Sequence, residues 1–237
     1  MSERVDEREG EMTMTYRLIT FDVFSALGDI RGTFVPKLNE LDVFVGKDAR
    51  AFFDLWRAKQ YEYMVVFNSL EREFMSFLDI TRRTLDYALS RYEIELASTT
   101  KDELVEMWGE IEFWEEARRV VQKVKEKGYE IAMLSNGGEA LLQRLADRFG
   151  VEFDYIFSAE HVGKYKPSPK MYALPYETLA LKPGEYLHVA GSTTDVFGAI
   201  ASNTPCAWSN RNRDILLDIE MKPTYELKNL IELLTYI

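Results

Sequence analysis

The chain has 237 residues, of which 46% are hydrophobic and 29% charged, and its formal net charge is −11. This composition is typical of a globular protein and excludes a disordered chain. The negative charge argues against binding to nucleic acids or anionic membranes, because phosphate groups would be repelled. A single cysteine, Cys206, excludes a disulfide framework and indicates a reducing compartment. With no long apolar run and no secretory pattern, we expect a cytoplasmic enzyme.

The first predicted strand carries the candidate nucleophile. Residues 1–15 are polar, and we expect a disordered tail there, whereas residues 16–24 form an apolar run typical of a buried parallel strand. Asp22 lies near the carboxyl end of this run, where burying a carboxylate is costly unless its charge is needed. Because open α/β sheets have their chemistry beyond the carboxyl ends of the strands, Asp22 is the candidate nucleophile.

A helical block follows the first strand. Residues 25–47 contain several glycines and a proline with little periodicity, which predicts loops. Apolar residues then recur at helical spacing, which predicts a helix from Asp48 and two more at about 73–92 and 100–109. We therefore expect an all-helical cap domain at 33–109, inserted into a core domain that comprises 16–32 and 110–237.

Beyond residue 110, helices and strands alternate, which predicts an α/β fold with a doubly wound parallel sheet, a Rossmann-like core. The expected strands are 129–134, 155–157, 186–190 and 206–209, the last of the core. The expected helices are 113–127, 139–149, one that begins at Ser168-Pro169, one that runs from Asp195 to about 202, and a closing helix at 226–237.

Each predicted strand has polar residues at its carboxyl end. Ser135, Asn136 and Gly137 follow the second strand, Lys166 lies in the loop after the third, and Asp195 follows the fourth. These residues suit nucleophilic carboxylate chemistry, in which Asp22 attacks and forms an ester. The Ser-Asn-Gly turn would hold the anionic part of a substrate. Lys166 would keep Asp22 ionised, and Asp195 would fix a metal or the water that opens the ester.

The same segments resemble the four motifs of the haloacid dehalogenase superfamily of hydrolases. They are Phe21-Asp22-Val23-Phe24, Leu134-Ser135-Asn136-Gly137, Lys166-Pro167 and Asp195, in that order along the chain. The resemblance covers most of residues 17–237, and the helical insertion is similar to the family's cap. It implies an aspartate nucleophile and a covalent aspartyl intermediate.

Within this superfamily the chain is similar to the L-2-haloacid dehalogenases. The segment Trp56 to Gln60, followed by Tyr61 and Tyr63, resembles their cap helix, in which the arginine that matches Arg57 contacts the halide or the substrate. Tyr172 and the segment from Cys206 to Arg211 match that subfamily too. Phe24 favours it further, because phosphatases of the superfamily usually have a proton-donating Asp there, and a leaving halide needs no proton.

The chain also departs from the dehalogenase pattern at four positions. Ser25 and Ala26 stand where a glycine and a threonine are expected, and Ala190 and Ser192 stand where a serine and an asparagine position the hydrolytic water. Three hypotheses follow. The first is a cofactor-independent dehalogenase-like hydrolase of a small anionic substrate. The second is a magnesium-dependent phosphatase, with the metal held by Asp22, the Phe24 carbonyl and Asp195. The third is a catalytically weak relative that acts as a binding protein.

The dehalogenase hypothesis gives each candidate residue a role. Asp22, Lys166 and Asp195 would be catalytic, and the substrate-binding residues would be Phe24, Ser25, Arg57, Ser135, Asn136, Gly137, Tyr172 and Ser192. Arg57 and Asn136 would receive the halide, and Ser135 with neighbouring amides would bind the carboxylate. His161 and His188 have no partner at metal-ligand spacing, so we expect both to be structural. A small anionic substrate is the expected partner, and the chain is compatible with a homodimer.

Overall fold

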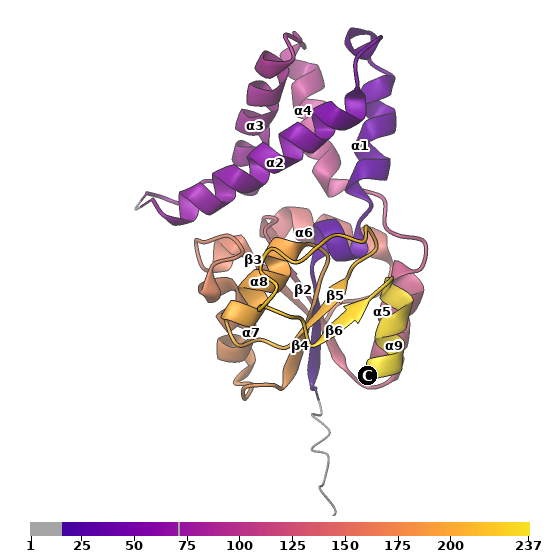
Figure 1. Cartoon of the computed structure of the whole chain (residues 1–237), viewed down its shortest axis with the longest axis vertical. Coiled ribbons are helices and arrows are strands. Elements are labelled where there is room, and N and C mark those ends of the chain that lie inside the picture. Colours follow the sequence, from indigo (N-terminus) through magenta and orange to yellow (C-terminus); the bar gives the residue numbers. More distant parts are fainter. Residues whose placement is uncertain (1–15, 71) are drawn as a thin grey trace, which may run out of the picture.

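A computed structural model describes residues 16–70 and 72–237, so the predicted tail at 1–15 lies outside the described residues. Within them, six strands form one parallel sheet in the order β3-β2-β1-β4-β5-β6 (Figure 1). The strands are β1 (Leu18–Phe21), β2 (Glu130–Ser135), β3 (Tyr155–Ser158), β4 (Tyr186–Ala190), β5 (Cys206–Ser209) and β6 (Tyr225–Leu227). The predicted doubly wound parallel sheet is confirmed.

The order of the strands reverses between β1 and β4, which are neighbours in the sheet. Phe21, the last residue of β1, pairs with Met133 of β2 on one side and with Val189 of β4 on the other. Asp22 therefore leaves the sheet at the point where the chain winds in both directions. Ligands bind at such switch points in open α/β sheets, since the loops diverge there.

Helices cover both faces of the sheet. Alternate residues of β1 face opposite sides: Ile19 and Phe21 pack on the side of α5 and α9, and Leu18 packs on the side of α6, α7 and α8. These helices are α5 (Ala117–Glu126), α6 (Glu139–Phe149), α7 (Pro169–Leu179), α8 (Thr193–Ala201) and α9 (Leu233–Tyr236). Because the strands are buried on both faces, polar residues in them need partners from within the protein.

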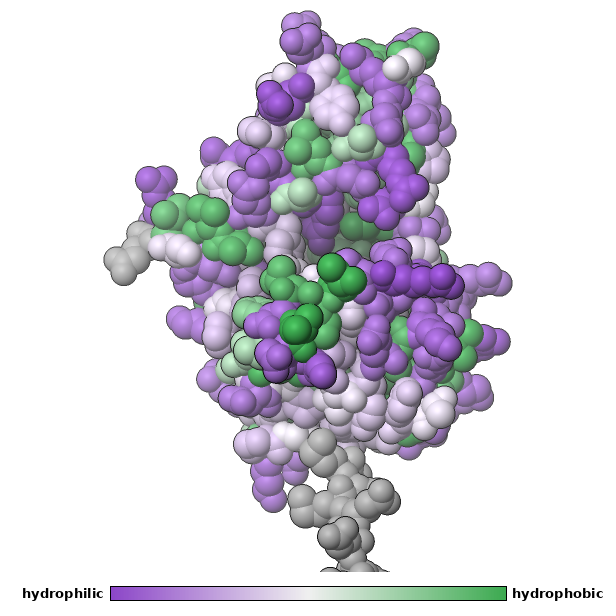
Figure 2. Space-filling view, viewed as in Figure 1, coloured by the Kyte–Doolittle hydropathy of each residue, from purple (hydrophilic) through white to green (hydrophobic). Residues whose placement is uncertain are grey.

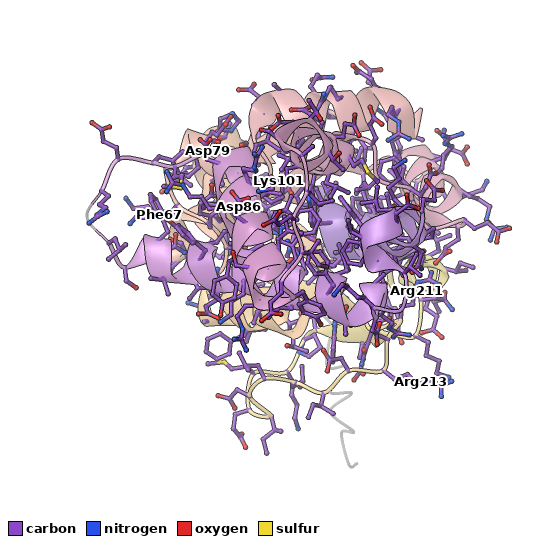
Figure 3. All side chains as sticks on the ribbon, turned by 90° about the horizontal axis from the view of Figure 1, so that it is seen from above. Phe67, Asp79, Asp86, Lys101, Arg211 and Arg213 are labelled. Atoms are coloured by element: carbon purple, nitrogen blue, oxygen red, sulfur yellow. The ribbon has the colours of Figure 1, made fainter. Side chains whose placement is uncertain are left out.

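The upper part of Figure 1 consists of α1 to α4, beyond the carboxyl ends of the strands. These helices are α1 (Ile30–Asn39), α2 (Ala49–Asn68), α3 (Phe77–Arg91) and α4 (Ser98–Glu106). Aromatic rings join them, since Phe34 of α1 stacks on Phe53 of α2 with ring centroids 5.2 Å apart. Lys101 of α4 pairs with Asp86 of α3 at 2.7 Å (Figure 3). That pair is half-exposed, so apolar packing is the main source of stability in this layer.

Two segments differ from the sequence prediction. Residues 25–47 were expected to be loops, but they contain α1, which Asp29 caps by accepting a hydrogen bond from Gly32 N at 2.8 Å. Gly32 and Pro36 obscured the helical pattern, whereas burial of Phe34 and Leu38 four residues apart stabilises the helix.

The second difference is at the carboxyl end of the chain. The expected closing helix at 226–237 begins instead with β6, so β5 is not the last strand. A 3-10 turn (Leu230–Glu232) and the short α9 follow it. Pairing with the exposed edge of β5 satisfies the backbone of β6, a contact that local periodicity does not reveal. Among the described helices, none is both long enough and apolar enough to span a membrane.

Candidate active site

Asp22 directly follows β1 and caps a π-helical turn (Val23–Leu27). Its Oδ2 atom accepts three hydrogen bonds, from Ser25 Oγ at 2.5 Å, Ser25 N at 2.8 Å and Ala26 N at 3.3 Å. Its Oδ1 atom has one partner among the described residues, Lys166 Nζ at 3.4 Å. The two oxygens therefore differ: Oδ2 is anchored by three donors, and Oδ1 is the one left free to attack.

Lys166 lies between the two carboxylates of the site and is only 2% exposed. Its Nζ atom is 2.9 Å from Asp195 Oδ2 and 3.4 Å from Asp22 Oδ1. Asn136 fixes the backbone of this lysine, since its Oδ1 accepts from Lys166 N at 2.7 Å. The loops after β1, β2, β3 and β4 thus meet around Lys166, three of them at its ammonium group and the β2 loop at its backbone.

Asp195 lies in the first turn of α8, a helix that begins after Ser192. Tyr172 of α7 donates to Asp195 Oδ1 at 2.7 Å, while Oδ2 faces Lys166. Burial would raise the pKa of Asp195, but Lys166 and His188 outweigh it and hold that pKa well below its usual range. Burial and the charge of Asp195 both raise the pKa of Tyr172, so its hydroxyl remains a neutral donor. Asp195 is ionised and firmly held.

His188 of β4 is a site neighbour that we expected to be only structural. Its Nε2 atom is 3.0 Å from Asp195 Oδ2 and 3.1 Å from Lys166 Nζ. Its Nδ1 atom is 2.8 Å from Thr20 Oγ1, on the paired position of β1. A signal was present, since His188 is the one strongly polar residue in the Tyr186–Ala190 strand. His161 lies elsewhere, beside Glu139 at 3.3 Å.

The turn after β2 contributes to the site more through its shape than through Ser135 itself. Ser135 is fully buried, and its Oγ accepts from Gly137 N at 3.3 Å. Gly137 leaves room for the Phe24 ring, which would lie 3.2 Å from a Cβ at position 137. Asn136 uses its Oδ1 for Lys166 N, and its Nδ2 has no acceptor in the parts of the chain that the structure describes. That amide nitrogen can donate to a substrate.

Arg57 of α2 brings a cation from the helical layer towards Asp22. Its guanidinium lies 5.3 Å from the Trp108 ring and 6.0 Å from the Phe24 ring, and it donates to Gln60 Oε1. Gln60 in turn donates to Thr81 Oγ1 of α3 at 2.5 Å. Burial lowers the pKa of Arg57, and the charge of Asp22 opposes that shift. Arg57 therefore interacts electrostatically with the candidate nucleophile.

Tyr61, one helical turn beyond Arg57, is a second residue that our site prediction did not include. Its buried hydroxyl has no hydrogen-bond partner among residues 16–70 and 72–237. Burial raises the pKa of Tyr61, and the nearby Thr194 hydroxyl partly opposes this. Tyr61 thus presents a neutral donor at the boundary of α2 and α8, where a substrate acceptor could satisfy it. The spacing of four residues from Arg57 was the available signal.

A cavity of about 870 Å³ leads to the turn that holds Asp22. It is lined from the helical layer by residues such as Arg57 and Phe53, and from the core by Phe24, Ser25 and Asn212. On the face drawn in Figure 2 the surface is hollowed between the helical layer and the sheet layer. A small substrate can therefore approach between the two layers.

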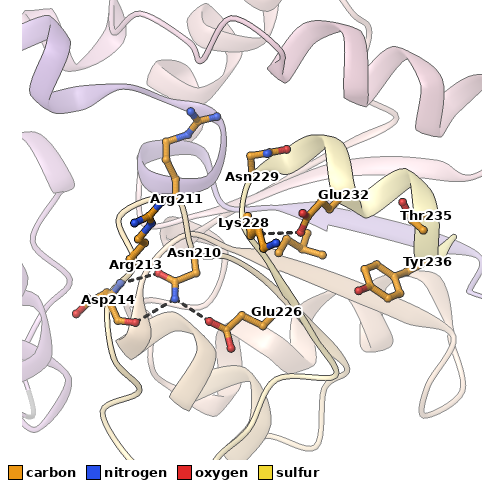
Figure 4. Close-up of a pocket in the computed structure, with 11 residues that line it drawn as sticks. Asn210, Arg211, Arg213, Asp214, Glu226, Lys228, Asn229, Glu232, Thr235 and Tyr236 are labelled. Atoms are coloured by element: carbon orange, nitrogen blue, oxygen red, sulfur yellow. Dashed lines mark hydrogen bonds between the residues drawn. The ribbon is translucent and has the colours of Figure 1, made fainter.

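A larger cavity, of about 1080 Å³, lies near the end of β6 and is lined by residues of both charges (Figure 4). Asn210 holds its wall by donating from Nδ2 to Glu226 Oε1 at 2.8 Å and to the Asp214 carbonyl at 3.0 Å. Asp22, Lys166 and Asp195 line neither this cavity nor the smaller one, but only the smaller one is lined by Phe24 and Ser25, which follow Asp22, and by Arg57. The lining residues Phe24, Ser25 and Arg57 therefore make the smaller cavity the one that adjoins the candidate site.

The residues present do not fit the magnesium site of the phosphatase hypothesis. The oxygens of Asp195 already accept from Tyr172, Lys166 and His188, so they offer little to a cation. The hypothesised site would offer two carboxylates and one carbonyl, and among the described residues no further His, Cys, Asp or Glu joins them in a group of three that could hold a metal ion. Position 191 cannot supply another ligand, because a Cβ on Gly191 would lie 2.2 Å from the Ser25 carbonyl carbon.

We expect Gly191→Ala to destabilise the protein by about 1–3 kcal/mol and to lower activity, because the added methyl group must displace the turn that anchors Asp22. Urea unfolding and turnover measure the two effects. Gly128→Ala is the matched control: its φ of +93° strains an alanine, but no atom lies within 4 Å of the new Cβ. It should lose about 1 kcal/mol and keep its activity. Equal activity of the two variants would contradict the prediction.

We also expect the free energy of unfolding to decrease in two steps as the pH is lowered. Burial and Lys166 lower the pKa of His188, although Asp195 opposes them. Below about pH 6.5 the unfolded chain binds a proton at His188 that the folded chain does not, so stability falls. The lowered pKa of Asp195 acts in the same direction below about pH 4. Urea titrations from pH 8 to 3 test this: His188→Gln should remove the first step, and an unchanged profile would contradict it.

Comparisons with known proteins agree on one group. A family model described as haloacid dehalogenase-like hydrolase matches residues 16–203. The (S)-2-haloacid dehalogenase 4A of Burkholderia cepacia is 30% identical over 190 residues, which cover 79% of this chain and 80% of that protein. The (S)-2-haloacid dehalogenase of Pseudomonas sp. strain YL is 27% identical over 214 residues, which cover 90% of each.

Solved structures give the same result. A crystal structure of a dehalogenase with an intermediate complex has a TM-score of 0.86 and 25% identity to this chain, and the match covers 94% of this chain and 97% of that one. An L-2-haloacid dehalogenase from Xanthobacter autotrophicus has a TM-score of 0.79 at 22% identity, covering 92% and 97%, which supports the fold alone. The likeness thus includes both the sheet and the helices α1 to α4.

Proposed function

Because the chain belongs to the haloacid dehalogenase-like hydrolases, we propose that it hydrolyses a small 2-haloacid through an ester on Asp22. The observation that carries this proposal is the asymmetry of the Asp22 carboxylate, in which Oδ2 has three donors and Oδ1 has only the distant Lys166. We further propose that 33–109 acts as a cap over a core of 16–32 and 110–237. The relatives named as (S)-2-haloacid dehalogenases support the substrate class.

In the first step, Asp22 Oδ1 attacks C2 of the haloacid. A C–O bond forms as the carbon–halogen bond breaks, and the halide leaves with the bonding electron pair, so no proton donor is needed. Phe24, which lines the cavity beside Asp22, has no proton donor in its side chain. Arg57 and Asn136 Nδ2 are the groups that can receive the halide, and Lys166 balances the charge of the two carboxylates.

In the second step, water adds to Cγ of the Asp22 ester. The negative charge then develops on Oδ2, where the donors Ser25 N, Ser25 Oγ and Ala26 N are already aligned. Collapse of this intermediate restores the aspartate and releases the 2-hydroxy acid, and one proton goes to solvent. We assign Lys166 and Asp195 to positioning the water. Ser25 thereby supplies the hydroxyl that Ala26 lacks.

Two assays test the proposal. Purified protein is incubated with the separate enantiomers of 2-chloropropionate in EDTA, and with p-nitrophenyl phosphate and Mg²⁺. We expect chloride release from the L enantiomer without metal, and no phosphate release. Phosphate release that EDTA abolishes would instead support the phosphatase hypothesis. No release of chloride or phosphate from either substrate would support the third hypothesis, a catalytically weak relative that acts as a binding protein.

The tyrosine at position 61 bears on which haloacid fits. Its hydroxyl forms no hydrogen bond of ordinary geometry among the described residues, although the Thr194 side chain is near enough to interact with it, so a substrate with a hydrogen-bond acceptor near C2 would compete with Thr194 for this donor. A purely apolar substituent would leave Thr194 as the neighbour on which this donor depends. Comparing chloride release from 2-chlorobutyrate and 2-chlorosuccinate tests this preference.

A further inference from the structure

We propose that His188 is a positioning residue of the reaction: it holds Asp195 and, through it, fixes Lys166 relative to Asp22. Its kinetic consequence rests on the proposed function, but the hydrogen-bond arrangement does not. The observation is a continuous chain of three buried polar side chains, from Thr20 to His188 to Asp195. All three are 3% exposed or less, so no contact is shared with bulk water.

This row of hydrogen-bonded side chains begins in the middle of the sheet, on β1 and β4. Thr20 of β1 and His188 of β4 are directly paired, so their side chains lie on the same face. The distances are 2.8 Å from Thr20 Oγ1 to His188 Nδ1 and 3.0 Å from His188 Nε2 to Asp195 Oδ2. Two rigid strands therefore support the imidazole, and the imidazole supports a carboxylate at the start of a helix.

The two neutral tautomers of His188 pair its Nε2 atom differently, because both Asp195 Oδ2 and the Lys166 ammonium lie near that atom. If Nε2 carries the proton, it donates to Asp195 Oδ2, and Nδ1 accepts from the Thr20 hydroxyl. If Nδ1 carries it instead, Nε2 accepts from the Lys166 ammonium at 3.1 Å, but its lone pair then also faces the Asp195 carboxylate at 3.0 Å, and the Thr20 proton has no acceptor among the described residues. We therefore assign the neutral Nε2–H tautomer to His188.

The position of Lys166 shows what this arrangement does for the nucleophile. The ammonium is 2.9 Å from Asp195 Oδ2, 3.1 Å from His188 Nε2 and 3.4 Å from Asp22 Oδ1. It thus lies closest to the carboxylate that His188 holds and leaves the attacking oxygen only loosely bound. Without His188, Asp195 could turn towards solvent or towards Asp22, and Lys166 would follow it and pair more tightly with Oδ1.

The surroundings keep the imidazole neutral. The ring faces Lys166 from the loop after β3, Asp195 from α8, Tyr172 from α7 at a ring distance of 5.9 Å, and Cys206 from the paired position of β5. Burial and Lys166 lower the pKa of His188 more than Asp195 raises it. A protonated ring would be a second cation 3.1 Å from the ammonium.

Variants at position 188 separate hydrogen bonding from packing. We expect His188→Leu to lower kcat about 10- to 100-fold with KM changed less than threefold, because the lost bond is to a charged group that does not touch substrate. His188→Gln places an amide donor near the Nε2 position and should restore kcat to within about fivefold of wild type. His161→Leu, outside the site, is the matched control and should be neutral. Equal impairment of the Leu and Gln variants, both folded, would overturn the proposal, as would a fully active Leu variant.

The tautomer of His188 can be determined by NMR in the absence of substrate. In protein labelled with 15N at histidine, we expect His188 to show one protonated nitrogen, Nε2, with a coupling that disappears in His188→Gln and remains in His161→Leu. A protonated Nδ1 would overturn the proposal. If the protein releases no chloride but shows the Nε2–H tautomer, the substrate assignment fails and the arrangement of His188 stands.

Discussion

Asp22→Asn is expected to abolish turnover, with chloride release at least 10⁴-fold below wild type. The side-chain amide is neutral and a poor nucleophile, so the ester cannot form, and loss of a covalent nucleophile costs this much or more in other hydrolases. Asparagine has nearly the same shape, and Ser25 N and Ala26 N can still donate to its oxygen. We therefore expect the melting temperature to change little, so the loss reports chemistry and not unfolding.

The matched control for this variant is Asp48→Asn. Asp48 is an exposed aspartate that caps α2 by accepting from Ala51 N at 2.9 Å, and asparagine caps a helix equally well. A single turnover in [18O]water should add 18O to the peptide that contains Asp22 in wild type and in Asp48→Asn, but not in Asp22→Asn. Label on another carboxylate, or undiminished turnover in Asp22→Asn, would contradict the assignment of the nucleophile.

Lys166→Met is expected to have the second-largest effect, on both activity and stability. Methionine fills a similar volume but leaves Asp22 and Asp195 buried without their shared cation, which costs about 3 kcal/mol or more in comparable pairs. Chloride release should fall by about 10³-fold, because no charge then offsets the developing negative charge near the nucleophile. Urea unfolding at pH 7.5 and initial rates measure the two effects.

Lys170→Met is the control for this variant, because Lys170 is an exposed lysine on α7, four residues along the chain. We expect it to keep both stability and activity. The pKa of Asp195 should rise in Lys166→Met, since Lys166 is the main cation that lowers it. A variant that folds with wild-type stability would mean that the two carboxylates do not depend on this ammonium.

The sequence was sufficient to predict the sheet and the centre of the site for a common reason. Parallel strands have their carboxyl ends at one edge, so Asp22, Lys166 and Asp195 could be placed together from their positions after successive strands. Lys166 indeed contacts both acids. The alternation of apolar segments and turn residues predicted β1 to β5 in the same way, because each of these signals is local.

What the sequence did not reveal depends on contacts between distant segments. The role of His188 depends on its pairing with Thr20, which requires the register of β1 against β4. Tyr61 is near the site only because the fold brings this residue of α2 beside Thr194 of α8. The helix α1 was missed since Gly32 and Pro36 are weak helix formers, and β6 was missed because its partner is the edge of another strand.

The close approach of Gly191 to the backbone of Ser25 limits what the scaffold can be redesigned to do. A protein engineer who wished to add a metal ligand between β4 and α8 could not begin with a carboxylate at this position, because even a methyl group meets the turn at 2.2 Å. The turn from Val23 to Leu27 would have to be rebuilt first. A metal ligand at position 191 would therefore need coordinated changes in two loops, and no single substitution there would supply it.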